Sequence, residues 1–87
     1  MAKVEWDYSH LAAAYVKRPD YAVDALNEMF QIAGVSKGAR VCDIGAGVAH
    51  LTIPLLNHGC VVDAVEPNDA MRAGGKARTS GREGVAW

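Results

Sequence analysis

Apolar residues recur along one stretch of the chain at helical spacing. They are Val23, Leu26, Met29, Phe30 and Ala33. This spacing gives one apolar face and predicts a helix over about 21–33. Asp20 is suited to cap its first turn, and Gly34 is suited to end it in a left-handed conformation. An alanine-rich stretch at 8–17 predicts a shorter helix before it, which Pro19 ends.

Two compact apolar runs follow, at 40–44 and 61–65, and both predict β-strands. The second run is continuous, which is typical of a parallel strand that is buried on both faces. Between the runs, 49–58 predicts a helix that ends at Gly59. Pro54 lies inside this helix and is expected to kink it or to confine regular hydrogen bonding to one side of the proline, because proline has no N–H to donate.

The last part of the chain predicts one more helix and the beginning of a third strand. Pro67 ends the second apolar run, and Asn68 or Asp69 can cap the helix that follows. The segment TSGREG at 79–84 predicts a turn, and 85–87 begins a third strand. The alternation of strands and helices predicts an α/β fold with a parallel sheet.

Composition and charge restrict the possible functions. The 87 residues allow one small domain, and 51% hydrophobic with 22% charged residues is a globular composition. The formal net charge of −1 lacks the basic excess that a nucleic-acid or membrane surface requires, so we expect neither partner. No apolar run follows Met1, so we expect no signal peptide or membrane span and a cytoplasmic location. The C-terminal stretch is locally basic and is interpreted as a solvated helix face, with Arg72, Lys76, Arg78 and Arg82.

The cysteines and histidines do not indicate a metal or an acid–base site. Cys42 and Cys60 lie in the apolar runs without metal-ligand spacing, so we expect buried, reduced thiols and no metal. Surface or capping roles are favoured for His10, His50 and His58, which have no suggestive pairing.

The residues with the most informative chemistry lie where the two main strands are expected to end. Asp43 closes the first strand, Gly45 and Gly47 follow it, and Glu66 closes the second strand nineteen residues after Gly47. Glycines let the backbone approach a ligand closely, and a carboxylate at the second strand end can accept hydrogen bonds from both ribose hydroxyls of an adenosine. The alternatives are a plain tight turn, a helix-capping role for Asp43 and a solvated carboxylate at Glu66.

His50 indicates which class of nucleoside cofactor the site can take. It stands where the dinucleotide fingerprint GxGxxG requires its third glycine, and an imidazole there would crowd a pyrophosphate. The chain also has no GxxxxGK[ST] motif, which excludes a P-loop. Nicotinamide, flavin and nucleoside-triphosphate binding are therefore disfavoured.

Three segments together resemble a known family. DxGxGxA at 43–49, VEPNDAM at 65–71 and the preceding YSHLAAAYVKRPDY at 8–21 are similar to class I S-adenosylmethionine-dependent methyltransferases, in their small-molecule branch. The resemblance implies a partial Rossmann-like fold, with a helical N-terminal lid at 1–34 and a cofactor-binding half-domain at 35–87. At Ala49 the sequence departs from the family, many of whose members have a third glycine.

The resemblance also implies a cofactor and its contacts. S-adenosylmethionine would bind, with S-adenosylhomocysteine as the product. Asp43, Gly45, Ala46 and Gly47 would line the methionine moiety, and Glu66 would hold the ribose. The adenine would be bordered by Pro67, Asn68 and Met71. In the lid, Tyr15 and Arg18 would approach the cofactor carboxylate. No catalytic residue is indicated.

The resemblance covers only part of the family's sheet of seven strands, since this sequence supplies two strands and the start of a third. We therefore expect the cofactor-binding subunit of a split methyltransferase that acts on a small molecule. A complementary polypeptide would form a hetero-oligomer with it and supply the acceptor site. The alternatives are a non-catalytic binding or scaffold subunit and a truncated, inactive fragment.

Overall fold

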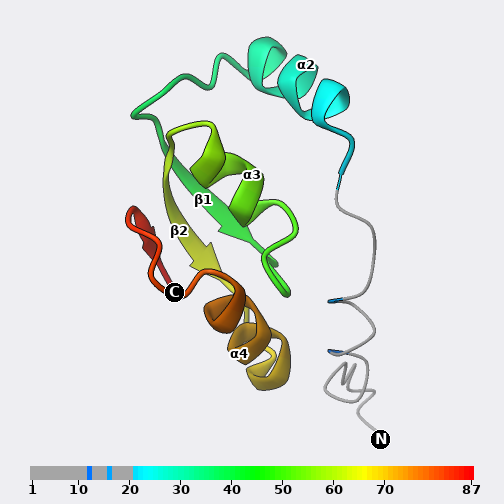
Figure 1. Cartoon of the computed structure of the whole chain (residues 1–87), viewed down its shortest axis with the longest axis vertical. Helices are drawn as coiled ribbons and strands as arrows, with labels where there is room; N and C mark the ends of the chain where they lie inside the picture. Colours follow the sequence, from blue (N-terminus) through cyan, green and yellow to red (C-terminus); the bar gives the residue numbers. More distant parts are fainter. Residues whose placement is uncertain (1–11, 13–15, 17–20) are drawn as a thin grey trace, which may run out of the picture.

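The computed structural model describes Ala12, Val16 and residues 21–87. Figure 1 shows the order of the elements along the chain. They are α2 (Val23–Ala33), β1 (Arg40–Ile44), α3 (Thr52–Asn57), β2 (Val61–Val65), α4 (Asp69–Arg78) and β3 (Val85–Ala86). Ala12 and Val16 are helical, and the rest of the helix predicted at 8–17 lies outside the described residues.

The strands form a three-stranded parallel sheet in the order β1-β2-β3. The predicted bounds of the first two strands are confirmed, and the third strand begins at Val85 as expected. This is a small α/β domain. Helices connect the strands because parallel neighbours need a crossover. All strands therefore end at the same edge of the sheet, where residues 45–49 also lie (Figure 1).

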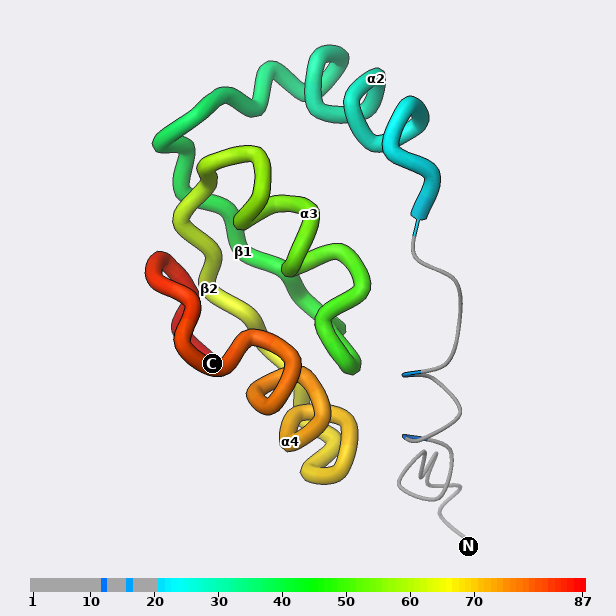
Figure 2. Tube along the Cα trace, viewed as in Figure 1, coloured from blue at the N-terminus to red at the C-terminus, as the bar shows by residue number. Residues whose placement is uncertain are grey.

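The helices cover one face of the sheet. Each step from β1 to β2 to β3 moves in the same direction, and right-handed crossovers then place α3 and α4 on the same side. The tube in Figure 2 shows α2 beyond α3, at the end of the sheet where the strands begin. The core lies between α2, α3 and this sheet face, and its buried members are Leu26, Phe30, Leu55, Leu56, Cys60 and Val62.

The opposite face of the sheet is not covered by any described residue. Alternate residues of β1 and β2 point to it, and Ile44, Val61 and Val65 are 79%, 42% and 47% exposed. We call this surface, formed by Arg40, Cys42, Ile44, Val61, Asp63 and Val65, the bare face. The prediction that 61–65 is buried on both faces is therefore wrong.

An ion pair crosses the bare face. Arg40 Nε lies 2.9 Å from Asp63 Oδ2, and this hydrogen bond raises the pKa of the guanidinium. Exposed ion pairs contribute little to the free energy of unfolding. The main effect of this pair is that the bare face carries one positive and one negative charge beside its apolar residues.

The prediction that both thiols are buried is wrong for Cys42, which is exposed on the bare face, and confirmed for Cys60. Burial raises the pKa of the Cys60 thiol. The neutral thiol is thus favoured in the folded state. Its contribution to the free energy of unfolding is fully present below the ordinary pKa of a cysteine thiol, and it is lost as the pH rises through the raised pKa.

The difference in burial between Cys42 and Cys60 predicts selective labelling of one cysteine. At pH 8 in the folded protein, a thiol reagent should modify Cys42 at about the rate of a free thiol. Cys60 should react at least about a hundredfold more slowly, because reaction needs an opening of the core. Mass spectrometry of the timed reaction measures both rates, and urea-unfolded protein is the control. Equal rates in the folded protein would contradict the placement of Cys60.

The two helices before β2 begin later than the sequence predicts. Ala22, rather than Asp20, is the N-cap of α2, while Gly34 ends this helix with φ 69° as expected. The helix predicted at 49–58 begins only at Thr52. Pro54 therefore lies in its first turn, where N–H groups have no partner within the helix, so no kink is required.

No helix among the described residues is long and apolar enough to cross a membrane.

Candidate functional site

The structure brings Asp43, the glycine turn and Glu66 together at the carboxyl ends of β1 and β2. We define the glycine turn as residues 45–49. It has left-handed backbone at Gly45 (φ 75°) and Gly47 (φ 58°), which glycine adopts without steric cost. A Cβ built on either glycine would meet no described residue within 4 Å apart from its chain neighbours. Among the described residues, the space beside the turn is therefore open to a ligand that approaches the backbone.

Glu66 is joined to the glycine turn by a direct hydrogen bond. The N–H of Gly47 donates to Glu66 Oε1 at 2.8 Å, and the N–H of Asn68 donates to Oε2 at 2.9 Å. The carboxylate is half-buried. It is thus a fixed acceptor beside the turn rather than a freely solvated strand-end group.

Asp43 is buried, with 8% of its surface exposed, and it accepts a hydrogen bond from the Thr52 hydroxyl at 2.6 Å. Thr52 is fully buried at the start of α3. The sequence alone does not indicate this partner, because Thr52 lies inside the stretch 49–58 that predicts a helix. The bond ties the end of β1 to the first turn of α3, so Asp43 has a structural contact whatever it does with a ligand.

The residues predicted around an adenine have different environments. Pro67 is exposed. Asn68 caps α4, as predicted, because its side chain accepts from the N–H of Met71 at 2.9 Å. Met71 is buried, as a side chain that packs in the core is. Ala46, between the two glycines, is also buried.

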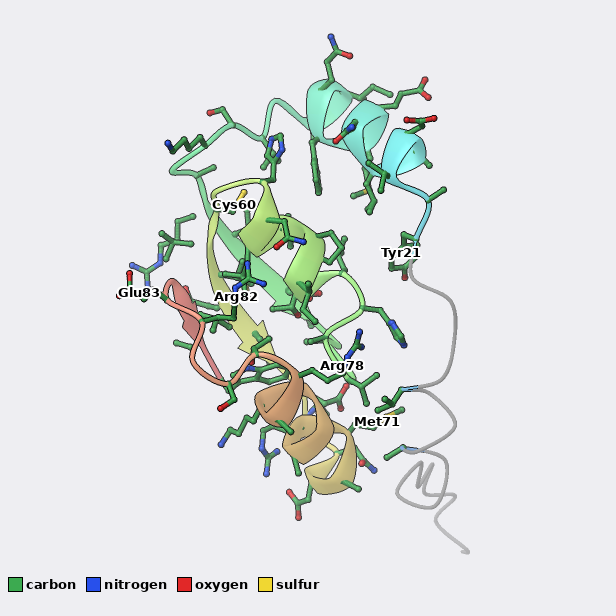
Figure 3. The ribbon with its side chains drawn as sticks, in the orientation of Figure 1. Tyr21, Cys60, Met71, Arg78, Arg82 and Glu83 are labelled. Atoms are coloured by element: carbon green, nitrogen blue, oxygen red, sulfur yellow. The ribbon has the colours of Figure 1, made fainter. Side chains whose placement is uncertain are left out.

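Two of the basic residues of α4 do not belong to a solvated face. Arg72 Nη1 donates to the carbonyl of Glu66 at 2.8 Å. Arg78 Nη1 donates to the carbonyl of Val48 at 2.8 Å and lies 3.4 Å from His50 Nδ1. Figure 3 shows the Arg78 side chain reaching from the end of α4 to the glycine turn. The prediction of a solvated basic face is therefore wrong at these two positions, which brace the backbone around the site.

A close approach of α4 to the turn depends on Gly75. A Cβ at this position would overlap the Trp87 ring at Cη2 and lie 2.9 Å from the carbonyl oxygen of Gly47. Trp87 Nε1 donates to Thr79 Oγ1 at 3.0 Å. Gly75 lowers helix propensity, but it lets α4 pack against the glycine turn and lets Trp87 pack against α4.

The predicted lid is described only in part. A Cβ built on Gly74 would lie 3.8 Å from Val16 Cγ2 and 3.1 Å from Val48 Cγ1. Val16 therefore lies beside α4 and close to the glycine turn. Tyr15 and Arg18, predicted to approach the cofactor carboxylate, are outside the described residues.

A separate hollow of about 260 Å³ lies between α2 and α3. Its lining includes Tyr21, Leu26 and Phe30 from the α2 side, and Pro54 and His58 from the α3 side. The His58 ring is 4.5 Å from the Phe30 ring, and its Nε2 lies 3.0 Å from the Val35 carbonyl. None of the eight described residues that are predicted to bind a cofactor lines this hollow.

Within residues 21–87 and at the two described positions before them, no cluster of three or more histidine, cysteine or acidic residues could hold a metal ion. The arrangement offers an open glycine turn, a fixed carboxylate and a second, buried carboxylate. A neutral or cationic ligand with hydroxyl donors suits these groups better than an anion.

Comparisons with protein-family models, with curated proteins and with solved structures found no match to this chain.

Proposed function

We propose that the glycine turn and Glu66 bind S-adenosylmethionine, and that the chain is the cofactor-binding part of a class I methyltransferase with a Rossmann-like fold. The observation that carries this proposal is the placement of Glu66. Its carboxylate lies within hydrogen-bonding distance of the glycine turn, at the carboxyl ends of two adjacent parallel strands. Open α/β sheets bind ligands at this edge.

The described residues fit an adenosyl ligand. Oxygen atoms of Glu66 can accept from ribose hydroxyls, and the glycines leave room for the ligand beside the backbone. A cofactor with a sulfonium rather than a pyrophosphate suits a site next to a glutamate and an aspartate, because these acids repel phosphates. S-adenosylmethionine supplies an electrophilic methyl group, and transfer of this group needs positioning and exclusion of water more than covalent help from the protein.

The residues of this chain would hold the donor. Glu66 would orient the ribose, and the glycine turn would face the methionine moiety. Arg78 and Thr52 would act indirectly, since they fix the turn and the end of β1. We propose that a complementary polypeptide brings the small-molecule acceptor and covers the bare face, because parallel sheets are buried on both sides in stable α/β proteins.

A second candidate function is a non-catalytic binding subunit. The bare face favours it, since Ile44, Val61 and Val65 form an apolar surface suited to association. The two candidates differ in whether the cofactor binds.

The exposed acid Glu83 provides a matched control for testing the ribose contact. Glu66→Ala should weaken the binding of S-adenosylhomocysteine at least about tenfold in calorimetry, because hydrogen bonds to a charged group are lost. Glu83→Ala should bind like the unchanged protein. Equal affinities of the two variants would contradict the role of Glu66. Absence of binding to the unchanged protein, alone and with its complementary chain, would refute the enzyme proposal.

A further inference from the structure

The first three N–H groups of the glycine turn donate to Val65, at the end of β2, or to Glu66, which follows it. Gly45 N and Ala46 N donate to the carbonyl of Val65 at 2.8 Å and 3.0 Å. Gly47 N donates instead to a side chain, Glu66 Oε1, at 2.8 Å. Two of these contacts depend on backbone alone, whereas the third depends on the side chain of residue 66.

The other carboxylate oxygen of Glu66 holds the beginning of α4. Asn68 N donates to Oε2, and the Asn68 side chain in turn caps the helix at Met71 N. Arg72 Nη1 donates to the backbone carbonyl of Glu66 itself. Glu66 is therefore linked on one side to the glycine turn and on the other to the start of α4.

We infer that Glu66 is the positioning residue of the glycine turn, in addition to the ribose contact of the proposed function. The positioning role rests on the hydrogen bonds alone and does not require a ligand. A carboxylate offers about four acceptor sites, and backbone N–H groups use one on each oxygen. One site on each oxygen is left, so two vicinal hydroxyls can add to this arrangement without displacing the turn.

The Glu66→Gln variant separates the positioning of the glycine turn by residue 66 from the overall stability of the fold. Its amide has one oxygen and one NH₂ group, so it can accept from only one of the Gly47 and Asn68 N–H groups and opposes the other. In ligand-free Glu66→Gln, NMR-detected hydrogen exchange at Gly47 or Asn68 should accelerate at least about tenfold, as expected for a lost charge-assisted bond. Exchange at Val62, in the centre of the sheet, should be unchanged. Glu83→Gln is the control and should change neither.

The unchanged protein gives a second measurement that does not depend on a variant. A scalar coupling across the hydrogen bond, between the Gly47 nitrogen and the Glu66 carboxylate carbon, should be detectable. If the coupling is absent, or Glu66→Gln exchanges at Gly47 and Asn68 as the unchanged protein does, the inference is overturned. Failure of S-adenosylhomocysteine to bind would refute the proposed function but would leave these two results standing.

Discussion

Gly75→Ala is expected to destabilise the protein by about 3 kcal/mol, which is the upper part of the range for overpacking in a fixed environment. The new Cβ would overlap Trp87 Cη2 and lie 2.6 Å from Trp87 Cζ2. A movement of the Trp87 ring away from α4 would break its hydrogen bond to the hydroxyl of Thr79. Thr79 is buried, so this hydroxyl could not bond water instead. The Cβ would also lie 2.9 Å from the Gly47 carbonyl oxygen, and backbone cannot rotate away as a side chain can.

The neighbouring Gly74 provides the matched control. Its Cβ would meet Val48 Cγ1 at 3.1 Å, which a side chain can relieve by a small movement. Alanine also gains about 1 kcal/mol of helix propensity over glycine. Gly74→Ala should therefore be neutral or slightly stabilising. The midpoints of urea unfolding followed by circular dichroism measure both variants, and similar midpoints would show that α4 does not approach the turn as described.

Thr52→Val is expected to cost about 2–3 kcal/mol, because it leaves a buried carboxylate oxygen without its donor. Valine keeps the shape of the threonine side chain and removes only the hydroxyl. The change in the free energy of unfolding therefore measures the loss of the 2.6 Å hydrogen bond to Asp43. Thr52→Ser keeps the hydroxyl and loses one buried methyl group, at a cost of about 1 kcal/mol.

A double-mutant cycle isolates the interaction between these two residues. Asp43→Ala, Thr52→Val and the double variant should show a coupling free energy of more than about 1 kcal/mol in urea unfolding, because the two side chains are in direct contact. A coupling near zero, or equal costs for the valine and serine variants, would mean that the bond does not stabilise the end of β1.

The strands could be predicted closely from the sequence, because compact apolar runs between turn residues have few other interpretations. Which faces of the sheet are covered by helices could not be predicted from the sequence. Val61 and Val65 lie in an apolar run that suggests burial on both faces, yet the order β1-β2-β3 places both crossover helices on one side. The direction in which a sheet grows is a tertiary property that neither run contains. Cys42 is exposed for the same reason.

The site could be predicted in its main acids and glycines but not in its supporting contacts. Glu66 was placed beside the turn by its distance from Gly47 along the chain, and the hydrogen bond between them agrees with that placement. Thr52 and Arg78 were missed, because each reaches its partner only through the way that α3 and α4 pack. No local pattern marks a threonine that bonds nine residues back or an arginine that bonds thirty residues back.

The most direct test of the central claim is an NMR titration of ¹⁵N-labelled protein with S-adenosylhomocysteine. The claim is that the edge formed by the glycine turn and Glu66 binds the adenosyl cofactor. It predicts saturable shifts of the amides of Gly45, Ala46, Gly47 and Asn68, with little change at Phe30 and His58 in the hollow between α2 and α3. No shift up to the solubility limit of the ligand, both for the protein alone and for its complex with the complementary chain, or shifts confined to that hollow, would contradict it.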